Sequence, residues 1–320
     1  MKTAIITGVT GQDGQYLAEL LLTKQYRVIG IVRSYNNSRV LKLNYLNTGN
    51  NILLEECDLT DISSIVKLLH KYEPQEVYNL AAQSSVGLSF EQPIGTIQFN
   101  TISVLNLLES IRLVDKSIKF YQASSSEMFG KVKNLPITED SALHPLSPYA
   151  ISKASSYWTV TNYRESYGLF ASNGILFNHE SFLRSNNFFV KKVLLESIQI
   201  SKGLQQVLKV GNIDIKRDFG YAPEYVKAMW LMLQVDSAED FIICSGQSIS
   251  LREIIHFVFD RLGISKNRIV IDQKLYRPTE IFDIYGDNSK AKAKLAWKYD
   301  LSFFEVLDTI LTQELEIFPK

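Results

Sequence analysis

The chain has 320 residues, of which 46% are hydrophobic, and its 34 lysines and arginines equal its 34 aspartates and glutamates. A chain of this length and composition folds into one large or two modest globular domains. Because the formal net charge is zero, no overall field attracts the protein to nucleic acid or to an anionic membrane surface. Any anionic ligand must therefore be bound by local groups.

Short β-rich runs alternate with helix-length segments through the first half of the chain. The apolar runs predict strands at 3–7, 27–32, 52–55, 76–80, 118–123 and 171–176. Helical spacing of apolar residues predicts helices at 14–24, 61–72, 96–114 and 148–167. Regular alternation of this kind predicts the α/β fold class, with a doubly wound parallel sheet of the Rossmann type.

The remainder of the chain predicts shorter elements. They are a helix near 187–202, a strand near 206–210, and helices near 224–234, 250–262 and 301–315. We expect residues 1–177 to form the sheet domain and residues 178–320 a smaller C-terminal α/β lobe that binds substrate, with part of 211–235 returning to the first domain. A ligand cleft is expected between them, because pockets favour domain interfaces and the carboxyl ends of parallel strands.

Cysteines and histidines are too sparse for a disulfide framework or a metal site. Cys57 and Cys244 lie far apart without C-x-x-C spacing, which indicates buried thiols in a reducing compartment. The four histidines include no pair at metal-ligand spacing, so no metal is predicted. The N-terminal apolar run reaches Gly8 too soon for a signal-peptide core or a membrane-spanning helix, and we expect a cytoplasmic protein.

Three glycines, Gly8, Gly11 and Gly14, stand between the first predicted strand and the first predicted helix. A tight turn at this point lets backbone N–H groups and the helix N-terminus face a pyrophosphate. An ordinary loop is the alternative interpretation of three glycines. The strand, helix and second strand around them favour a dinucleotide-binding turn.

The end of the second predicted strand carries Arg33 where an NAD enzyme commonly has an acid for the ribose hydroxyls. Arg33 and the nearby Arg39 can pair with a 2′-phosphate, which favours NADP, with NAD as the alternative. Both arginines could instead be solvated surface charges. Asp58, after the third strand, either contacts the adenine or caps the helix at 61.

Tyr149 and Lys153 lie four residues apart on the helix predicted after Ser147-Pro148, so their side chains share a face. A tyrosine needs a nearby cation to lower its pKa from about 10 before it can take a proton from a hydroxyl near neutral pH. A surface tyrosine beside a solvated lysine is the alternative. After a glycine turn and a fifth strand, the pair indicates hydride chemistry on a nicotinamide.

The fifth predicted strand runs into Ser124-Ser125-Ser126-Glu127, which places hydroxyls and a carboxylate at a ligand-facing strand end. Here the chain resembles the GDP-mannose 4,6-dehydratase family of the extended short-chain dehydrogenase/reductase superfamily, over nearly its full length. The segments that carry the resemblance are GVTGQDGQYLAELLL, SSSEMFG, SPYAISK, NYRESYG, NGILFNHES, KRDFGYAPEYV, and RPTEI followed by GDNSKAKAKLAWK.

The resemblance implies a set of site residues. The implied catalytic residues are Ser125, where the family usually has threonine, Glu127, Tyr149 and Lys153. Those expected at the cofactor are Gly8, Thr10, Gly11, Gln12, Asp13, Gly14, Arg33, Asp58, Leu59, Leu80, Ala81, Ala82, Tyr149, Lys153 and His179, the last with a structural role as its alternative. Those expected at the nucleotide sugar are Ser84, Ser85, Asn178, Val190, Lys191, Arg217, Arg277 and Glu280.

The resemblance also implies a reaction and a partner. Tyr149 would take the proton from the C4 hydroxyl of a GDP-sugar while hydride passes to NADP, and Glu127 would then remove the C5 proton and help expel the C6 hydroxyl as water. The acid argues against the epimerases of the superfamily, which lack one at this place. The cofactor would be regenerated and stay bound.

One departure from the family leaves the sugar open. The family commonly reads HESPRRG where this chain has His179 to Ser185, HESFLRS. GDP-N-acetylglucosamine or a GDP-heptose is therefore an alternative to GDP-mannose. A GDP-4-keto-6-deoxy-sugar reductase and a non-catalytic NADP-binding protein are the alternatives from other classes.

The polar segment from 33 to 40 resembles the family loop that reaches into a neighbouring subunit's cofactor site. We therefore expect a homotetramer, or a homodimer, and a surface loop is the alternative. Neither nucleic acid nor a membrane is expected as a partner.

Overall fold

A computed structural model describes residues 1–36 and 51–318 of the chain. Its centre is a seven-stranded sheet in which every neighbouring pair is parallel, in the order β10-β6-β5-β4-β1-β2-β3. The strands are β1 (Thr3–Thr7), β2 (Arg27–Val32), β3 (Ile52–Glu56), β4 (Glu76–Asn79), β5 (Lys119–Ser125), β6 (Ala171–Leu176) and β10 (Phe241–Ile243). The predicted fold class is confirmed.

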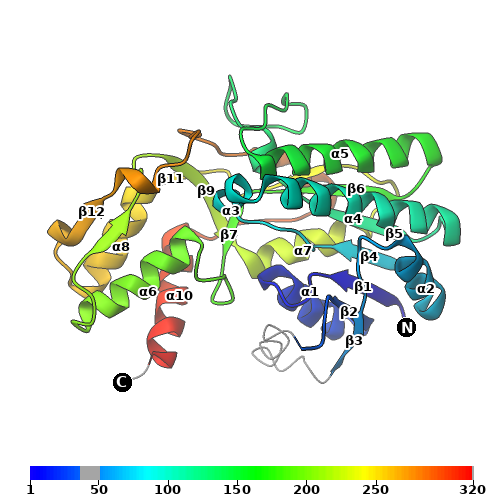
Figure 1. Cartoon of the computed structure of the whole chain (residues 1–320), viewed down its shortest axis with the longest axis horizontal. Coiled ribbons are helices and arrows are strands. Elements are labelled where there is room, and N and C mark those ends of the chain that lie inside the picture. Colours follow the sequence, from blue (N-terminus) through cyan, green and yellow to red (C-terminus); the bar gives the residue numbers. More distant parts are fainter. Residues whose placement is uncertain (37–50, 319–320) are drawn as a thin grey trace.

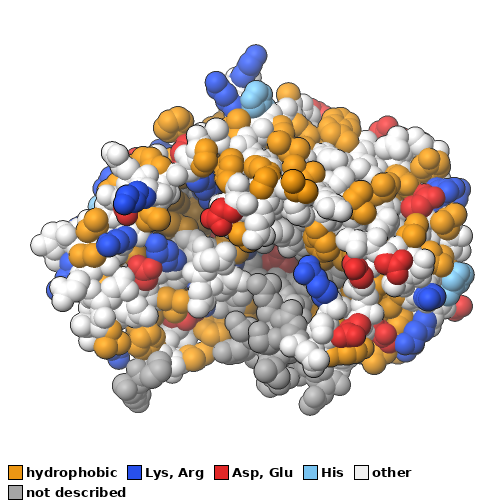
Figure 2. All heavy atoms as spheres, in the orientation of Figure 1, with side chains coloured by type: hydrophobic (Ala, Val, Ile, Leu, Met, Phe, Trp, Pro, Cys, Tyr) orange, Lys and Arg blue, Asp and Glu red, His pale blue; other side chains and the backbone are white. Residues whose placement is uncertain are grey.

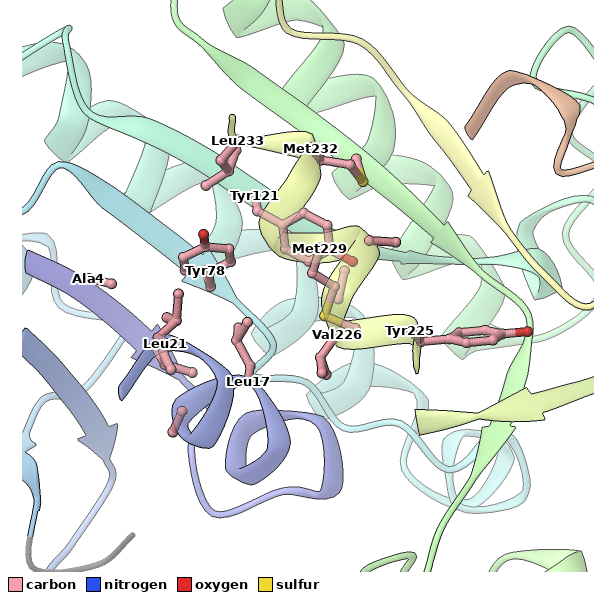
Figure 3. Close-up of a cluster of buried hydrophobic side chains, with 14 of the residues drawn as sticks. Ala4, Leu17, Leu21, Tyr78, Tyr121, Tyr225, Val226, Met229, Met232 and Leu233 are labelled. Carbon is pink, nitrogen blue, oxygen red and sulfur yellow. The ribbon is translucent and has the colours of Figure 1, made fainter. Parts of the chain in front are cut away.

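Helices cover both faces of this sheet (Figure 1). One face carries α1 (Gln12–Thr23), α7 (Ala222–Met232) and α9 (Ser289–Leu295), and the other carries α2 (Ile62–Tyr72), α4 (Pro93–Val114) and α5 (Pro148–Tyr167). Successive strand residues point to opposite faces, so Ala4 and Ile6 join one buried cluster and Ile5 joins the other. Figure 3 shows Leu17 and Leu21 of α1 packed with Met229 of α7 in the first cluster.

The second lobe is built from small sheets and three further helices. Its strands are β7 (Asn178–Glu180), β8 (Leu208–Val210), β9 (Lys216–Tyr221), β11 (Ser248–Ser250) and β12 (Ile269–Ile271), arranged as β11-β9-β7 and β12-β8. Its helices are α6 (Phe189–Ser201), α8 (Leu251–Leu262) and α10 (Phe303–Ile317), which share one hydrophobic core. A short α3 (Val86–Glu91) precedes α4.

The predicted elements are all present, with ends that differ by at most three residues; α4, for example, begins at 93 where 96 was predicted. The sequence patterns did not predict β7, β9, β10, β11, β12, α3 or α9. Several of these are strands of three residues, which are too short to show a period of their own. Among the described residues, no helix is both long and apolar enough to cross a membrane.

The chain leaves the main sheet after β6 and returns to it through α7, β10 and α9. We therefore propose that the sheet domain consists of 1–177 completed by these three elements, and that the rest of 178–320 forms the lobe. Five crossings between the domains result, at β6–β7, β9–α7, β10–β11, β12–α9 and α9–α10. They hold the lobe over the carboxyl ends of the central strands, as Figure 1 shows.

The edge strand β10 is fixed by the buried carboxylate of Asp240, which precedes it. Arg164 of α5 donates to both Asp240 oxygens at 2.7 and 2.9 Å, and the backbone N–H and side-chain amide of Asn173 in β6 each donate to it at 3.0 Å. One carboxylate thus joins β6, β10 and α5.

Asp240→Asn should lower the free energy of unfolding by about 2–4 kcal/mol, because Arg164 would keep a largely buried charge without its counter-ion. The matched control is Asp308→Asn, which breaks an ion pair to Arg261 whose side chains are 42% and 52% exposed, and which should cost less than about 1 kcal/mol. Urea unfolding followed by circular dichroism measures both. Equal losses in the two variants would show that Asp240 has no special role.

Candidate functional site

A cavity of about 1020 Å³ lies between the carboxyl ends of the central strands and the second lobe. Its size is at the top of the range of about 300–1,000 Å³ for small-ligand pockets. Its walls combine the loops after β1, β2, β3, β4, β5 and β6 with the segment that leads to α6. The expected cleft between sheet and lobe is therefore present.

The glycine turn forms one end of this cavity. Gly8 has a φ of +69°, and a Cβ on it would lie 2.9 Å from the backbone nitrogen of Ala81. A Cβ on Gly14 would lie 2.4 Å from the Gly8 carbonyl oxygen, so the first turn of α1 packs directly on the loop. Gly11 is the N-cap of α1 and has no side chain to engage the N–H groups of the first turn. The turn thus fits a phosphate group of a dinucleotide.

Two residues that follow β2 and β3 also line the cavity. Arg33 is exposed, and its guanidinium lies 5.5 Å from the ring centroid of Phe99. Asp58 accepts hydrogen bonds from the backbone N–H and hydroxyl of Thr60 at 2.9 and 2.8 Å. Asp61, not Asp58, caps α2 by accepting from Ser63 N–H, so the capping alternative for Asp58 is wrong. Arg39 lies outside the described residues.

The expected cofactor residues converge on this one cavity. All of them line its wall: Gly8, Thr10, Gly11, Gln12, Asp13, Gly14, Arg33, Asp58, Leu59, Leu80, Ala81, Ala82, Tyr149, Lys153 and His179. They come from distant segments of the chain, since Gly8 and His179 are 171 positions apart in the sequence (179 − 8). The residues present therefore suit a nicotinamide dinucleotide laid across the strand ends.

Tyr149 and Lys153 stand on the first turns of α5. Ser147 caps this helix by accepting from Ala150 N–H at 3.1 Å, and Pro148 occupies its first position. Both side chains are buried, and the Lys153 ammonium donates to the Ala123 carbonyl at 2.6 Å while lying 5.9 Å from the Tyr149 ring centroid. The lysine is thereby fixed between the tyrosine and β5.

Burial opposes the charged forms of both groups. It raises the pKa of Tyr149 to about 12, although the Ser125 hydroxyl and the positive charge of Arg184 act in the lowering direction. Burial also lowers the pKa of Lys153 to about 8, against the raising effect of the Asp13 carboxylate. A dry site of this kind strengthens each charge that a ligand brings into it.

Ser125 and Glu127 stand at the end of β5, in the same cavity. Ser125 ends the strand and caps a short 3-10 turn over Ser126–Met128 by accepting from Glu127 N–H at 3.3 Å. Its hydroxyl also acts to lower the pKa of Tyr149, so it lies close to the phenol. The structure thus brings Ser125, Glu127, Tyr149 and Lys153 together, which gives one wall two hydroxyls, a carboxylate and an ammonium.

The expected substrate residues divide into two groups. Ser84, Ser85, Asn178 and Arg277 line the cavity, whereas Val190, Lys191, Arg217 and Glu280 do not. Val190 is 1% exposed within the lobe core, and Lys191 forms an ion pair with Glu314 of α10.

Arg217 is buried and donates to the Ile281 carbonyl at 2.6 Å. Burial lowers its pKa, and Glu127 and Glu280 act in the raising direction, so both carboxylates lie within electrostatic range of it. Glu280 accepts from the Arg277 backbone N–H at 3.4 Å. Arg217 and Glu280 thus lie near Arg277 without lining the cavity themselves.

Arg184 is a cavity residue that the sequence did not single out. It lies 3.3 Å from the Glu180 carboxylate and its guanidinium stacks over the Phe188 ring at 3.7 Å. Ser185, Asn187, Phe188 and Phe189 line the cavity beside it. The segment has no helical or strand periodicity, and the departure from the family over His179 to Ser185 was the signal in the sequence that pointed to it.

The family of the chain follows from comparison with known proteins. Residues 5–310 match the family model described as GDP-mannose 4,6 dehydratase. GDP-mannose 4,6 dehydratase 1 of Arabidopsis thaliana is 43% identical over 99% of this chain and 90% of its own, and the GDP-mannose 4,6 dehydratase of Cricetulus griseus is 42% identical over 99% and 92%. The structure of RMD from Pseudomonas aeruginosa, complexed with NADPH, superposes with a TM-score of 0.82 at 25% identity over 98% of both chains. The chain belongs to the GDP-mannose 4,6-dehydratase family.

Proposed function

We propose that the chain is an NADP-dependent hydro-lyase that converts GDP-mannose to its 4-keto-6-deoxy derivative. The observation that carries the proposal is the position of Glu127, a carboxylate in the same wall as Ser125, Tyr149 and Lys153 and in the same cavity as the glycine turn. A net reductase shares the hydroxyls and the lysine but has no use for this acid. The relatives named for GDP-mannose, at 42–43% identity over nearly the full chain, support the same substrate.

Different site residues carry out different steps of the proposed reaction. Tyr149 as phenolate takes the proton of the C4 hydroxyl, with the Ser125 hydroxyl positioning that oxygen. Bound NADP would supply a hydride acceptor for C4 and, once reduced, a hydride donor for C6, so that the cofactor would not be consumed. The 4-keto group acidifies the C5 hydrogen, Glu127 removes it, and the same carboxylic acid protonates the departing C6 hydroxyl, which leaves as water. After reduction at C6, one proton returns to C5, which balances the proton that Tyr149 took from the C4 hydroxyl.

The remaining site residues would hold the two ligands. Arg33 would pair with the 2′-phosphate, which favours NADP over NAD. Ser84, Ser85, Asn178 and Arg277 would hold the GDP-sugar, with Arg217 and Glu280 fixing the Arg277 side of the wall. Because the side chains of Val190 and Lys191 are engaged in the lobe, only their main chain could face the guanine.

The proposed assembly is a homotetramer, with a homodimer as the smaller alternative. The helices α4 and α5 pack side by side and expose apolar side chains, namely Ile94, Ile97, Ile102, Leu105, Ile151 and Trp158. In the orientation of Figure 1, Figure 2 shows hydrophobic side chains gathered on the part of the surface where these helices and α3 lie. Such a face suits contact with a second copy. The two free, buried cysteines suit the cytoplasm as the compartment.

Glu127→Gln should lower turnover by about 10²–10⁴-fold, the usual range for loss of a general acid-base group. Binding of NADPH and GDP-mannose should be kept, because the amide has the shape of the acid. Mass spectrometry for loss of water from GDP-mannose, with GDP-N-acetylglucosamine and a GDP-heptose in parallel, measures the effect and the substrate preference. Glu224→Gln, a surface carboxylate paired with Lys227, is the control. Dehydration of none of these sugars by the unaltered protein would refute the proposed function.

Lys153→Met should slow dehydration by about 10²-fold or more and move the acid limb of the pH profile of kcat/KM to higher pH. The reason is that burial, together with the Glu127 and Asp13 carboxylates, raises the pKa of Tyr149 to about 12, and the substitution removes a neighbouring cation that favours the phenolate. Lys227→Met, a surface lysine, is the control. A slower enzyme with an unmoved acid limb would assign Lys153 to cofactor binding alone.

Trp158→Glu should shift the protein toward a smaller species in light scattering after gel filtration, because it places a charge in the exposed face of α4 and α5, where Trp158 is 58% exposed. Leu204→Glu, at a side chain that is 72% exposed just beyond α6, is the control. If the unaltered protein is a monomer, the assembly proposal is wrong.

A further inference from the structure

One partly buried ion pair joins the glycine turn to the second lobe. His179 Nε2 lies 2.9 Å from Asp13 Oδ2, across 166 positions of sequence. Gln12 of the same turn donates to the His179 carbonyl at 3.1 Å and accepts from the Ser181 hydroxyl at 2.8 Å. The first turn of α1 and the strand β7 are thereby held together at the edge of the cavity.

The geometry fixes the protonation state of the imidazole. The other ring nitrogen, Nδ1, lies 2.7 Å from the Phe177 carbonyl oxygen. A neutral imidazole has one N–H and one lone pair, so it would set a lone pair against an acceptor at one of the two contacts. With Asp13 ionised, as the lowered pKa of its carboxyl indicates, both contacts are satisfied only when both nitrogens carry protons. His179 is therefore an imidazolium.

Asp13 is the partner that needs this charge. It stands in the first turn of α1 between Gly11 and Gly14, in the wall that would receive the phosphates. A carboxylate in that place repels a phosphate, more strongly than in open water because its side chain is only 21% exposed. Here Gln12 donates to Oδ1 at 3.0 Å and His179 to Oδ2, so both oxygens of Asp13 have a donor.

The charged and titratable groups around the imidazole agree with this state. Asp13 faces it from α1, Arg184 from the segment after β7, Glu180 follows it on its own strand, and the Tyr225 ring of α7 stacks on it at 4.7 Å. Burial lowers the pKa of His179, but the Asp13 carboxylate outweighs burial and the net shift is upward. Burial by itself would raise the pKa of Asp13. The charge and hydrogen bond of His179 act in the opposite direction, and the net shift is downward.

We propose that His179 is a positioning residue whose imidazolium neutralises Asp13, so that the glycine turn can accept the phosphates of a dinucleotide. The proposal rests on the proposed function, since that function supplies the dinucleotide. Affinity for the cofactor would then depend on whether the charge of His179 balances that of Asp13. As the pH rises through the raised pKa of His179, the imidazolium is lost, Asp13 keeps only the Gln12 donor and the charge of Arg184, and affinity for NADPH should fall.

A charge-balance cycle tests this with binding of NADPH measured by fluorescence at low salt. His179→Asn should raise the Kd by about tenfold or more, the scale of one uncompensated charge near a phosphate. The double variant Asp13→Asn with His179→Asn should return to within about threefold of the unaltered protein, because no charge is left to repel. His70→Asn, at an exposed histidine on α2, is the control.

A loss in the double variant as large as in the single variant would overturn the proposal, because the pair would then act only as a structural link. So would an unchanged Kd in His179→Asn. Circular dichroism of each variant shows whether it is folded.

A second readout needs no cofactor. In the NMR spectrum of the free protein, the C2–H signal of His179, assigned by its absence in His179→Asn, should keep its imidazolium position above pH 6.5, the ordinary pKa of histidine. Titration of that signal at or below the ordinary value would overturn the proposal. Failure of the unaltered protein to bind NADPH would refute the proposed function, while the NMR result would still decide the charge of His179.

Discussion

The first turn of α1 lies directly on the loop that follows β1, and no Cβ atom fits between them. A side chain at position 14 would place its Cβ 2.4 Å from the Gly8 carbonyl oxygen, which no rotamer can relieve. Because Gly11 gives the helix no side-chain cap, its first N–H groups stay open to the cavity. The same close approach sets Gln12 and Asp13 against β7, so the position of the lobe depends on this contact.

The second constraint is the dryness of the site. Tyr149, Lys153 and His179 are all less than a tenth exposed, and each is a group that water would otherwise stabilise when charged. Their charges must be supported by neighbours: the Ser125 hydroxyl and Arg184 for the tyrosine, Asp13 for the other two. The cavity is thus a set of compensating charges rather than a field of one sign, which accords with the zero net charge of the chain.

The lobe contributes position more than chemistry. Its strand β7 continues directly from β6 and brings Asn178 and His179 to the cavity, while β9 pairs with β7 and leads into α7. Asp218 of β9 is buried and accepts from Ser245 and Gly246, the residues that follow β10. These contacts tie the lobe to both the edge strand and the central strands, so the cavity wall is held from two sides.

The sequence by itself determined whatever depends on neighbours along the chain. The strand and helix periods, the glycine turn and the Tyr149–Lys153 spacing are local, since backbone geometry places residues one turn apart on the same face. The resemblance added the role of Glu127, which spacing alone could not give. The choice of Asp58 or Asp61 as a cap was also local, but two acids within reach of the same helix start made it ambiguous.

Only the tertiary structure decided which distant groups meet. The strand β10 has three residues, too few to show a periodic pattern in the sequence. Its place in the sheet is set by the Asp240 carboxylate, which binds α5 and β6. The chain after β7 brings Arg184 to the cavity wall. Lys191 does not line the cavity, because its ammonium pairs with Glu314 of α10 within the lobe. The protonation of His179 follows from two acceptors contributed by Phe177 and Asp13. Such pairings depend on how whole elements pack, and the packing of α1 on β7 cannot be read from either segment alone.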